Sequence, residues 1–132
     1  MCSSVDVLRE NWLRTKSAAP AAIAHRRVGR PGRTAGDVYA AHARVLDERG
    51  LGAHRLNACG YSLGAKFTPS WMDWPMFYEA NPWEIAPGMV VFAHMILMDS
   101  DAGEAMCLGR TYLTTDGAPE PLSRHGNEML MR

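Results

Sequence analysis

The sequence predicts an α+β fold in which helices come first and a mostly antiparallel sheet follows. Three observations support this fold: a capped amphipathic segment over residues 34–49, an almost continuous apolar run over 89–98, and a second strand-like segment over 105–115. A length of 132 residues is enough for one domain. A hydrophobic content of 47% excludes intrinsic disorder and predicts a packed core.

Two helices are predicted in the first part of the chain. Residues 4–28 have a helical pattern. Thr34 is a typical N-cap with Asp37 as its capping-box partner, and the helix that it begins is expected to run to Arg49, with Gly50 as its C-terminal stop. The apolar face of this second helix is expected to bury Val38, Ala41, Val45 and Leu46.

The rest of the chain is predicted to form strands around an aromatic loop. A short strand is expected over residues 55–59. Residues 60–87 hold seven of the eleven aromatic side chains without a helix or strand period, so we expect an ordered loop that lines or covers a site. The apolar run 89–98, interrupted only by His94, predicts a buried strand. A hairpin turn at 99–103 leads into the returning strand 105–115.

Charge divides the chain into an arm, a domain and a tail. Residues 1–33 carry seven basic and two acidic side chains, whereas the remainder carries seven basic and twelve acidic ones. We therefore assign residues 1–27 to a basic helical arm and 28–124 to the main domain. Residues 118–132 are expected to be a loose tail, of which 125–132 lie beyond the domain.

Composition also bounds the class of protein. The formal net charge is zero, which argues against a nucleic-acid binder. No apolar run approaches the roughly 20 residues that span a bilayer, and no signal peptide is evident, so we expect a cytoplasmic protein without membrane contact. Three cysteines without CxxC spacing make a disulfide framework or a structural zinc site improbable.

Two local patterns need interpretation. The sequence GYSLG at 60–64 matches the GxSxG motif of serine hydrolases, but no helix is predicted after it, so a nucleophile elbow is not expected. His25, His42 and His54 are expected to be surface or helix residues. His94 is either a core histidine that neighbouring strands satisfy or a base or ligand that points into a cleft.

Several segments together resemble a known family. They are GYSLG at 60–64, PGMV at 87–90 and the ending TYLTTDG at 111–117. In order and spacing they resemble the C-terminal half of the pita-bread fold of methionine aminopeptidase, aminopeptidase P, prolidase, creatinase and ectoine hydrolase, over roughly residues 28–124. The segment GYSLGAKFTPSWMDWPMFYEANP at 60–82 is most similar to the branch near the dimethylsulfoniopropionate lyases and ectoine hydrolases.

The resemblance implies a site for two divalent metal ions, which the family holds with two Asp, one His and two Glu. Tyr61 stands at the position of the His, His94 at that of the first Glu, and Gly109 or Arg110 at that of the second Glu. The Asp pair ahead of the capped helix has no counterpart except Asp6. Because hard divalent ions need several carboxylate oxygens, we assign no metal ligand and expect no cofactor in this chain.

The aromatic segment suggests chemistry on a small zwitterionic substrate. Trp71 and Trp74 are suited to surround an onium cation, and Asp73 between them is suited to remove a proton next to a carboxylate. Tyr61 would polarise or protonate the departing group, and Lys66 would hold the substrate carboxylate. The candidate catalytic residues are Asp73, Tyr61 and His94, and the candidate substrate-binding residues are Trp71, Trp74, Lys66 and Arg110. The same aromatic side chains are equally suited to packing in a core or a subunit interface.

Three functions remain open from the sequence. The leading prediction is a small-molecule lyase or hydrolase that catalyses β-elimination from a sulfoniopropionate, as the resemblance implies. The first alternative is a catalytically inactive, truncated remnant or interaction module. The second is a metallopeptidase whose ligands come from a partner chain. Half of a sheet exposes strand edges, so a homodimer or a complementing chain is the expected partner.

Overall fold

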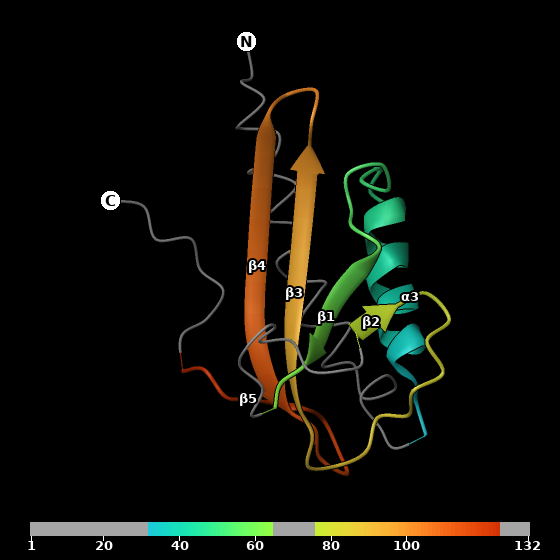
Figure 1. Cartoon of the computed structure of the whole chain (residues 1–132), viewed down its shortest axis with the longest axis vertical. Helices are drawn as coiled ribbons and strands as arrows, with labels where there is room; N and C mark the ends of the chain where they lie inside the picture. The colour runs from blue at the N-terminus through green and yellow to red at the C-terminus, as the bar shows by residue number, and fades with distance from the viewer. Residues whose placement is uncertain (1–31, 65–75, 125–132) are drawn as a thin grey trace.

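The computed structural model describes residues 32–64 and 76–124. Within these ranges one helix packs on a five-stranded sheet of order β2-β1-β3-β4-β5, in which all neighbouring strands are antiparallel (Figure 1). The elements are α3 (Ala35–Asp47), β1 (Ala58–Ser62), β2 (Met76–Tyr78), β3 (Val90–Asp99), β4 (Glu104–Leu113) and β5 (Glu120–Pro121). The predicted α+β class is confirmed. The predicted helix 4–28 and the tail 125–132 lie outside the described residues.

The capped helix is confirmed as α3. The Thr34 hydroxyl accepts a hydrogen bond from the Asp37 amide at 3.2 Å, and the Asp37 carboxylate accepts one from the Thr34 amide at 2.9 Å. The helix ends two residues before the predicted end, and Gly50 follows it with φ +73°. His42, expected to be a surface or helix residue, is a helix residue of α3, and it is buried, with 4% of the residue exposed. In the described ranges, no helix is long and apolar enough to cross a bilayer.

The face of α3 that packs on the sheet differs slightly from the predicted one. Val38 and Leu46 are buried as expected, whereas Ala41 and Val45 are only half-buried. The residues that are buried along the helix are Ala35, Gly36, Val38, Tyr39, His42, Ala43 and Leu46. Near its start the helix therefore packs through small residues, because the backbone at Gly36 lies close to the backbone of Asn81.

The hairpin of β3 and β4 is the longest pairing in the sheet. It runs without interruption from Val90 opposite Leu113 to Asp99 opposite Glu104. At the turn, one carboxylate oxygen of Asp99 accepts hydrogen bonds from two following amides, those of residues 101 and 102, at 3.1 and 3.0 Å. The predicted hairpin is confirmed within one or two residues at each end.

The short strands were not predicted correctly. The expected strand 55–59 lies three residues too early, because β1 covers 58–62. The expected loop 60–87 is wrong at both β1 and β2, since residues 60–62 and 76–78 are strands. The expected loose tail from 118 is wrong at β5, which pairs with Tyr112 and Leu113 of β4.

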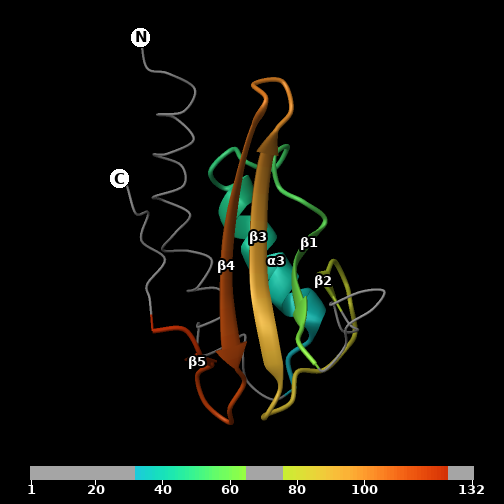
Figure 2. The ribbon, with the colours of Figure 1, turned by 60° about the vertical axis from the view of Figure 1, so that its left-hand side comes forward.

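Alternation along β3 separates the two faces of the sheet. Val91, Ala93, Met95 and Leu97 are buried, and the intervening residues are only half-buried. Figure 2 shows α3 behind the sheet, so the buried set faces the helix. The main core joins Val91, Ala93 and Met95 to residues of the helix, of the other strands and of the segment before β3, namely Ala35, Val38, Tyr39, Ala43, Cys59, Phe77, Ile85, Leu108 and Tyr112. Leu97 packs instead in a second, smaller cluster with Leu46 and Leu51.

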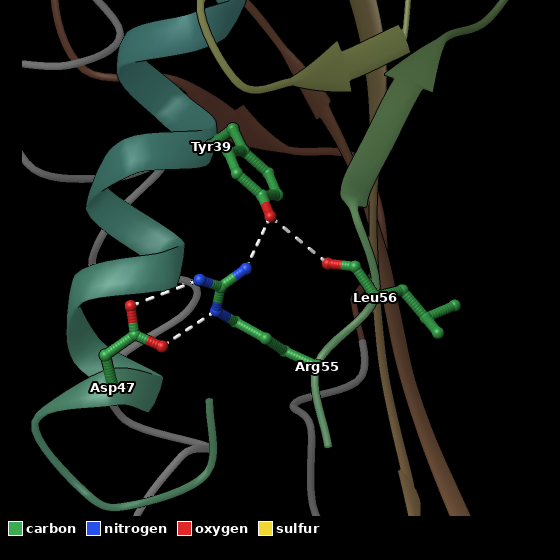
Figure 3. A network of polar contacts seen from close by, with 4 residues as sticks. All are labelled: Tyr39, Asp47, Arg55 and Leu56. Atoms are coloured by element: carbon green, nitrogen blue, oxygen red, sulfur yellow. Dashed lines mark hydrogen bonds and ion pairs between the residues drawn. The ribbon is translucent and has the colours of Figure 1, made fainter. Parts of the chain in front are cut away.

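A polar network fastens the segment before β1 to α3 (Figure 3). The Arg55 guanidinium donates two hydrogen bonds to the Asp47 carboxylate, at 2.8 and 3.2 Å, and one to the Tyr39 hydroxyl at 2.6 Å. The Tyr39 hydroxyl in turn donates to the carbonyl of Leu56 at 3.4 Å. The guanidinium lowers the pKa of the Asp47 carboxyl below 3.8 by hydrogen bonding, so the network stays ionised at neutral pH.

The close approach of β1 to β3 predicts an intolerant position at Gly60. A Cβ there would overlap the carbonyl oxygen of Phe92 and lie 3.1 Å from the Phe77 ring, and the glycine has φ +156°. We expect Gly60→Ala to lower the free energy of unfolding by about 1–3 kcal/mol, measured by urea unfolding. Gly117→Ala is the matched control, because nothing lies closer than 3.8 Å, and it should change stability by less than about 0.5 kcal/mol. Equal effects of the two substitutions would contradict the packing argument.

Burial of His42 predicts a loss of stability in mild acid. Desolvation, aided by the charge of Arg55, lowers the pKa of this imidazole from 6.5 to about 4. Between these pH values the unfolded chain binds a proton that the folded chain does not, so stability falls as pH decreases from 6.5 to 4. The full effect is about 3 kcal/mol.

Urea unfolding of the wild type and of His42→Gln across this pH range measures the effect. The variant should lose most of the slope whatever its stability at pH 7. The change at Asp47 falls below pH 3.8, outside the window. A wild-type protein that is equally stable at pH 7 and pH 4.5 would contradict the prediction, because it would show that folding does not lower the pKa of the His42 imidazole.

Candidate functional site

The sheet face opposite α3 carries a row of rings. Tyr61 of β1 lies directly opposite Phe92 of β3, and His94 follows two residues later on the same face. The ring centroids of Tyr61 and His94 are 6.1 Å apart in an edge-on arrangement. Phe92 lies 5.5 Å from the Tyr61 ring and 5.2 Å from the His94 ring. Tyr61 is buried, whereas Phe92 and His94 are half-buried, so the imidazole lies beside two rings and stays partly accessible.

A thiol completes this row. Cys107 of β4 is paired with Ile96 of β3, and it therefore shares the face of His94. Its Sγ lies 2.9 Å from Nε2 of the imidazole. Cys107 is an exposed residue, but its thiol is partly desolvated, and this desolvation raises the pKa of the thiol above 9.0. We define Tyr61, Phe92, His94 and Cys107 as the ring–thiol cluster.

The three sheet positions that the resemblance assigned to metal ligands lie on this same face. Gly109 is directly opposite His94, and Tyr61 is on the neighbouring strand. The Phe92 ring covers Gly109, so that a Cβ there would overlap the ring. The alternative position for the second ligand, Arg110, is paired with Ala93 and therefore faces the core side of the sheet. Of the two positions considered for the second Glu of the family, Gly109 is therefore the one on the same face as Tyr61 and His94.

These side chains do not fit a pair of hard divalent ions. The three positions provide a phenol, an imidazole and no side chain, where such ions need several carboxylate oxygens. Within residues 32–64 and 76–124, no group of three or more His, Cys, Asp or Glu is placed to hold a metal ion. We therefore derive no step through a metal on this face.

Arg110 has its own surroundings on the core side of the sheet. Its Nη2 donates a hydrogen bond to the carbonyl of Ser123 at 3.4 Å, and its guanidinium lies 5.9 Å from the Tyr112 ring centroid. Burial raises the pKa of the Tyr112 hydroxyl, an effect that nearby Arg110 opposes. Arg110 is thus separated by the sheet from Tyr61 and His94.

The structure places two of the three candidate catalytic residues together, Tyr61 and His94. The third, Asp73, lies outside the described residues, as do Trp71, Trp74 and Lys66. Sequence reasoning missed Cys107 and Phe92. The available signal was the hairpin register: a tight turn at 99–104 sets residues 94 and 107 on one face of the sheet.

A hollow beside α3 is a weaker candidate. It is lined by Tyr39, Ala40, Ala43, Arg44, Asp47, Glu48, Arg55 and Glu79. Arg55 is already bonded to Asp47, and the exposed pair of Arg44 and Glu48 is separated by 4.0 Å. Arg55 links the segment before β1 to Asp47 of α3, and Arg44 and Glu48 pair with each other, so these four charged groups already have partners.

One helix on one face of a five-stranded antiparallel sheet (Figure 2) agrees with the C-terminal half of the pita-bread fold. Residues 4–116 match metallopeptidase family M24. This match covers most of the chain, which therefore belongs to family M24. No curated protein matches the sequence.

Solved structures agree with this fold. An Xaa-Pro dipeptidase from Bacillus anthracis has a TM-score of 0.80 and 17% identity, covering 95% of this chain and 33% of its own. A prolidase from Pyrococcus horikoshii OT3 has a TM-score of 0.78 and 19% identity, with coverages of 92% and 33%. The N-terminal domain of the FACT complex subunit SPT16 from Eremothecium gossypii has a TM-score of 0.71 and 19% identity, with coverages of 96% and 29%. The chain thus spans about one third of the length of the structures that it matches.

Proposed function

We propose that this M24 domain acts on a small zwitterionic molecule as a lyase or hydrolase that uses protein side chains, on the sheet face that carries Tyr61 and His94. One observation supports the proposal most directly. The positions that would hold metal ligands converge on one face, but they present a phenol and an imidazole at a ring separation of 6.1 Å in place of carboxylates. A phenol and an imidazole are proton donors and acceptors, so this face suits acid–base chemistry.

The proposed reaction is β-elimination from a sulfoniopropionate, as in the lyase branch that segment 60–82 resembles. Asp73 removes the proton next to the substrate carboxylate, the C–H electron pair forms the new C=C bond, and the C–S bond breaks. A dialkyl sulfide leaves with the C–S pair, and acrylate remains. Tyr61 and His94 lie on the face where the departing group and the transferred proton would be stabilised. Arg110 is not part of this site, because the sheet separates it from both residues.

The aromatic segment would supply substrate binding in this proposal. Trp71 and Trp74 would contact the sulfonium, since ring faces attract cations by roughly 0.5–2 kcal/mol each. Lys66 would pair with the carboxylate. These roles rest on the sequence and its resemblance.

A second candidate is a non-catalytic interaction domain. It is favoured by the missing carboxylates at the three sheet positions, together with the likeness to a domain of a FACT complex subunit, which shows the fold in a subunit of an assembly. In this case Tyr61 and His94 would contact another protein instead of a substrate. The domain would keep its stability when Asp73 is replaced and would release no product.

Headspace analysis of the full chain with dimethylsulfoniopropionate separates the two candidates. We expect dimethyl sulfide from the wild type and a loss of about 100-fold or more in Asp73→Asn, because removal of a general base costs this much. Tyr61→Phe should also be slower. His54→Gln is the control, since the His54 imidazole lies 3.3 Å from the Met98 carbonyl at the far end of β3, and this variant should retain activity. No sulfide above the Asp73→Asn background would favour the non-catalytic domain.

Metal analysis tests the remaining alternative, in which a partner chain completes a metallopeptidase site. We expect the purified chain to contain far less than one equivalent of any divalent metal by plasma mass spectrometry, because the sheet positions lack carboxylates. Chelator should leave sulfide release unchanged. A stoichiometric divalent ion that survives gel filtration would overturn the proposed metal-independent site.

A further inference from the structure

We propose that Cys107 and His94 form a nucleophilic pair that adds to small, conjugated electrophiles such as α,β-unsaturated carbonyl compounds. The proposal goes beyond the function proposed above, which does not use the thiol. It rests on the 2.9 Å separation of Sγ and Nε2, on the exposure of Cys107, and on the rings that hold the imidazole. A nucleophile and a base within hydrogen-bond reach, with the base oriented by further groups, are the elements of an activated nucleophile.

The sheet fixes this arrangement. His94 and Cys107 are on adjacent strands of an uninterrupted hairpin, displaced by two residues along the pairing on the same face. The Tyr61 and Phe92 rings lie 6.1 and 5.2 Å from the imidazole and limit its rotation. Backbone pairing therefore keeps thiol and imidazole together without a mobile loop, and an electrophile reaches the sulfur from solvent.

Addition by the Cys107 thiol requires His94 as a base. Because burial raises the pKa of the Cys107 thiol, the sulfur keeps its proton at neutral pH and does not react as a free thiolate. In the proposed step, Nε2 of His94 accepts the S–H proton while sulfur forms a bond to the β-carbon of the electrophile. The C=C electron pair moves to the α-carbon, which then takes the proton back from the imidazolium. The addition has no leaving group and changes no net oxidation state.

Addition to a conjugated carbonyl is the class that these residues fit best. It requires only a nucleophile and one group that accepts and returns a proton, and the pair provides both. The nearby rings of Phe92 and Tyr61 offer an apolar surface to a flat, uncharged molecule. The described part of the cluster contains no carboxylate or guanidinium, so a neutral electrophile is favoured over a charged one.

The second described cysteine provides an internal control. Cys59 lies in the core at 1% exposure, and burial raises the pKa of its thiol to about 12. It should therefore stay unreacted in the folded protein and become labelled only when the chain unfolds. Labelling at Cys59 reports unfolding in every variant.

The test uses acrylamide as the electrophile and the full chain with Cys2→Ser throughout. Site-resolved mass spectrometry at pH 7 gives the rate constant for each cysteine, and N-acetylcysteine gives the rate of a free thiol. We expect Cys107 to react at least about tenfold faster than N-acetylcysteine, and His94→Gln to remove this advantage. His54→Gln is the matched control and should react like the wild type.

Two results would overturn the proposal. One is a wild-type Cys107 that reacts no faster than N-acetylcysteine. The other is a folded His94→Gln protein, with Cys59 unlabelled, that reacts at the wild-type rate. If His94→Gln unfolds and Cys59 becomes labelled, the comparison of wild-type Cys107 with the free thiol decides the matter alone. Loss of sulfide release does not affect this test, so it fails or succeeds independently of the proposed lyase.

Discussion

The alternation of side chains along β3 is the constraint on which the rest of the molecule depends. Val91, Ala93 and Met95 must face α3 to form the core, so Phe92 and His94 must face the other way. A slip of one residue would bury the imidazole and expose the core, which makes the register costly to change. The turn at one end of the hairpin and the hydrogen bonds of Thr114 to residues 86 and 89 at the other keep it in place.

An irregularity in β1 places Cys59 in the core and Tyr61 on the opposite face of the sheet, although the two residues are only two positions apart. Ala58 pairs with Tyr78 and Tyr61 with Met76, so β1 has one residue more than β2 between these pairs. Cys59 joins the core, while Tyr61 stays beside Phe92 on the opposite face. Gly60 lies within this irregular stretch, and a Cβ there would overlap the Phe92 carbonyl oxygen of β3. The position of the phenol next to the imidazole thus depends on a backbone feature rather than on the phenol itself.

Local signals predicted the elements that depend on local interactions. The capping box of Thr34 and the hairpin turn at 99–103 are each determined by residues within a few positions, and both were predicted from the sequence. The strands β2 and β5 have three and two residues and exist only through their pairing with longer strands, so no sequence period marks them. The burial of His42 likewise depends on what the helix packs against. The contact of His94 with Cys107 depends on the register between two strands, which the alternation of each strand alone does not supply.

The likeness to Xaa-Pro dipeptidases and the chemistry of the site are separate matters, because a fold specifies positions and the side chains specify reactions. Tyr61, His94 and Gly109 converge because β1, β3 and β4 are hydrogen-bonded neighbours, and this pairing is insensitive to which side chains point outward. A carboxylate at position 109 would have to displace the Phe92 ring, which now occupies that space and supports the imidazole. The glycine and the phenylalanine are therefore coupled: the ring that orients His94 is compatible with Gly109 and incompatible with an acidic ligand. On this face, the Phe92 ring in its present position and a carboxylate side chain at position 109 exclude each other sterically.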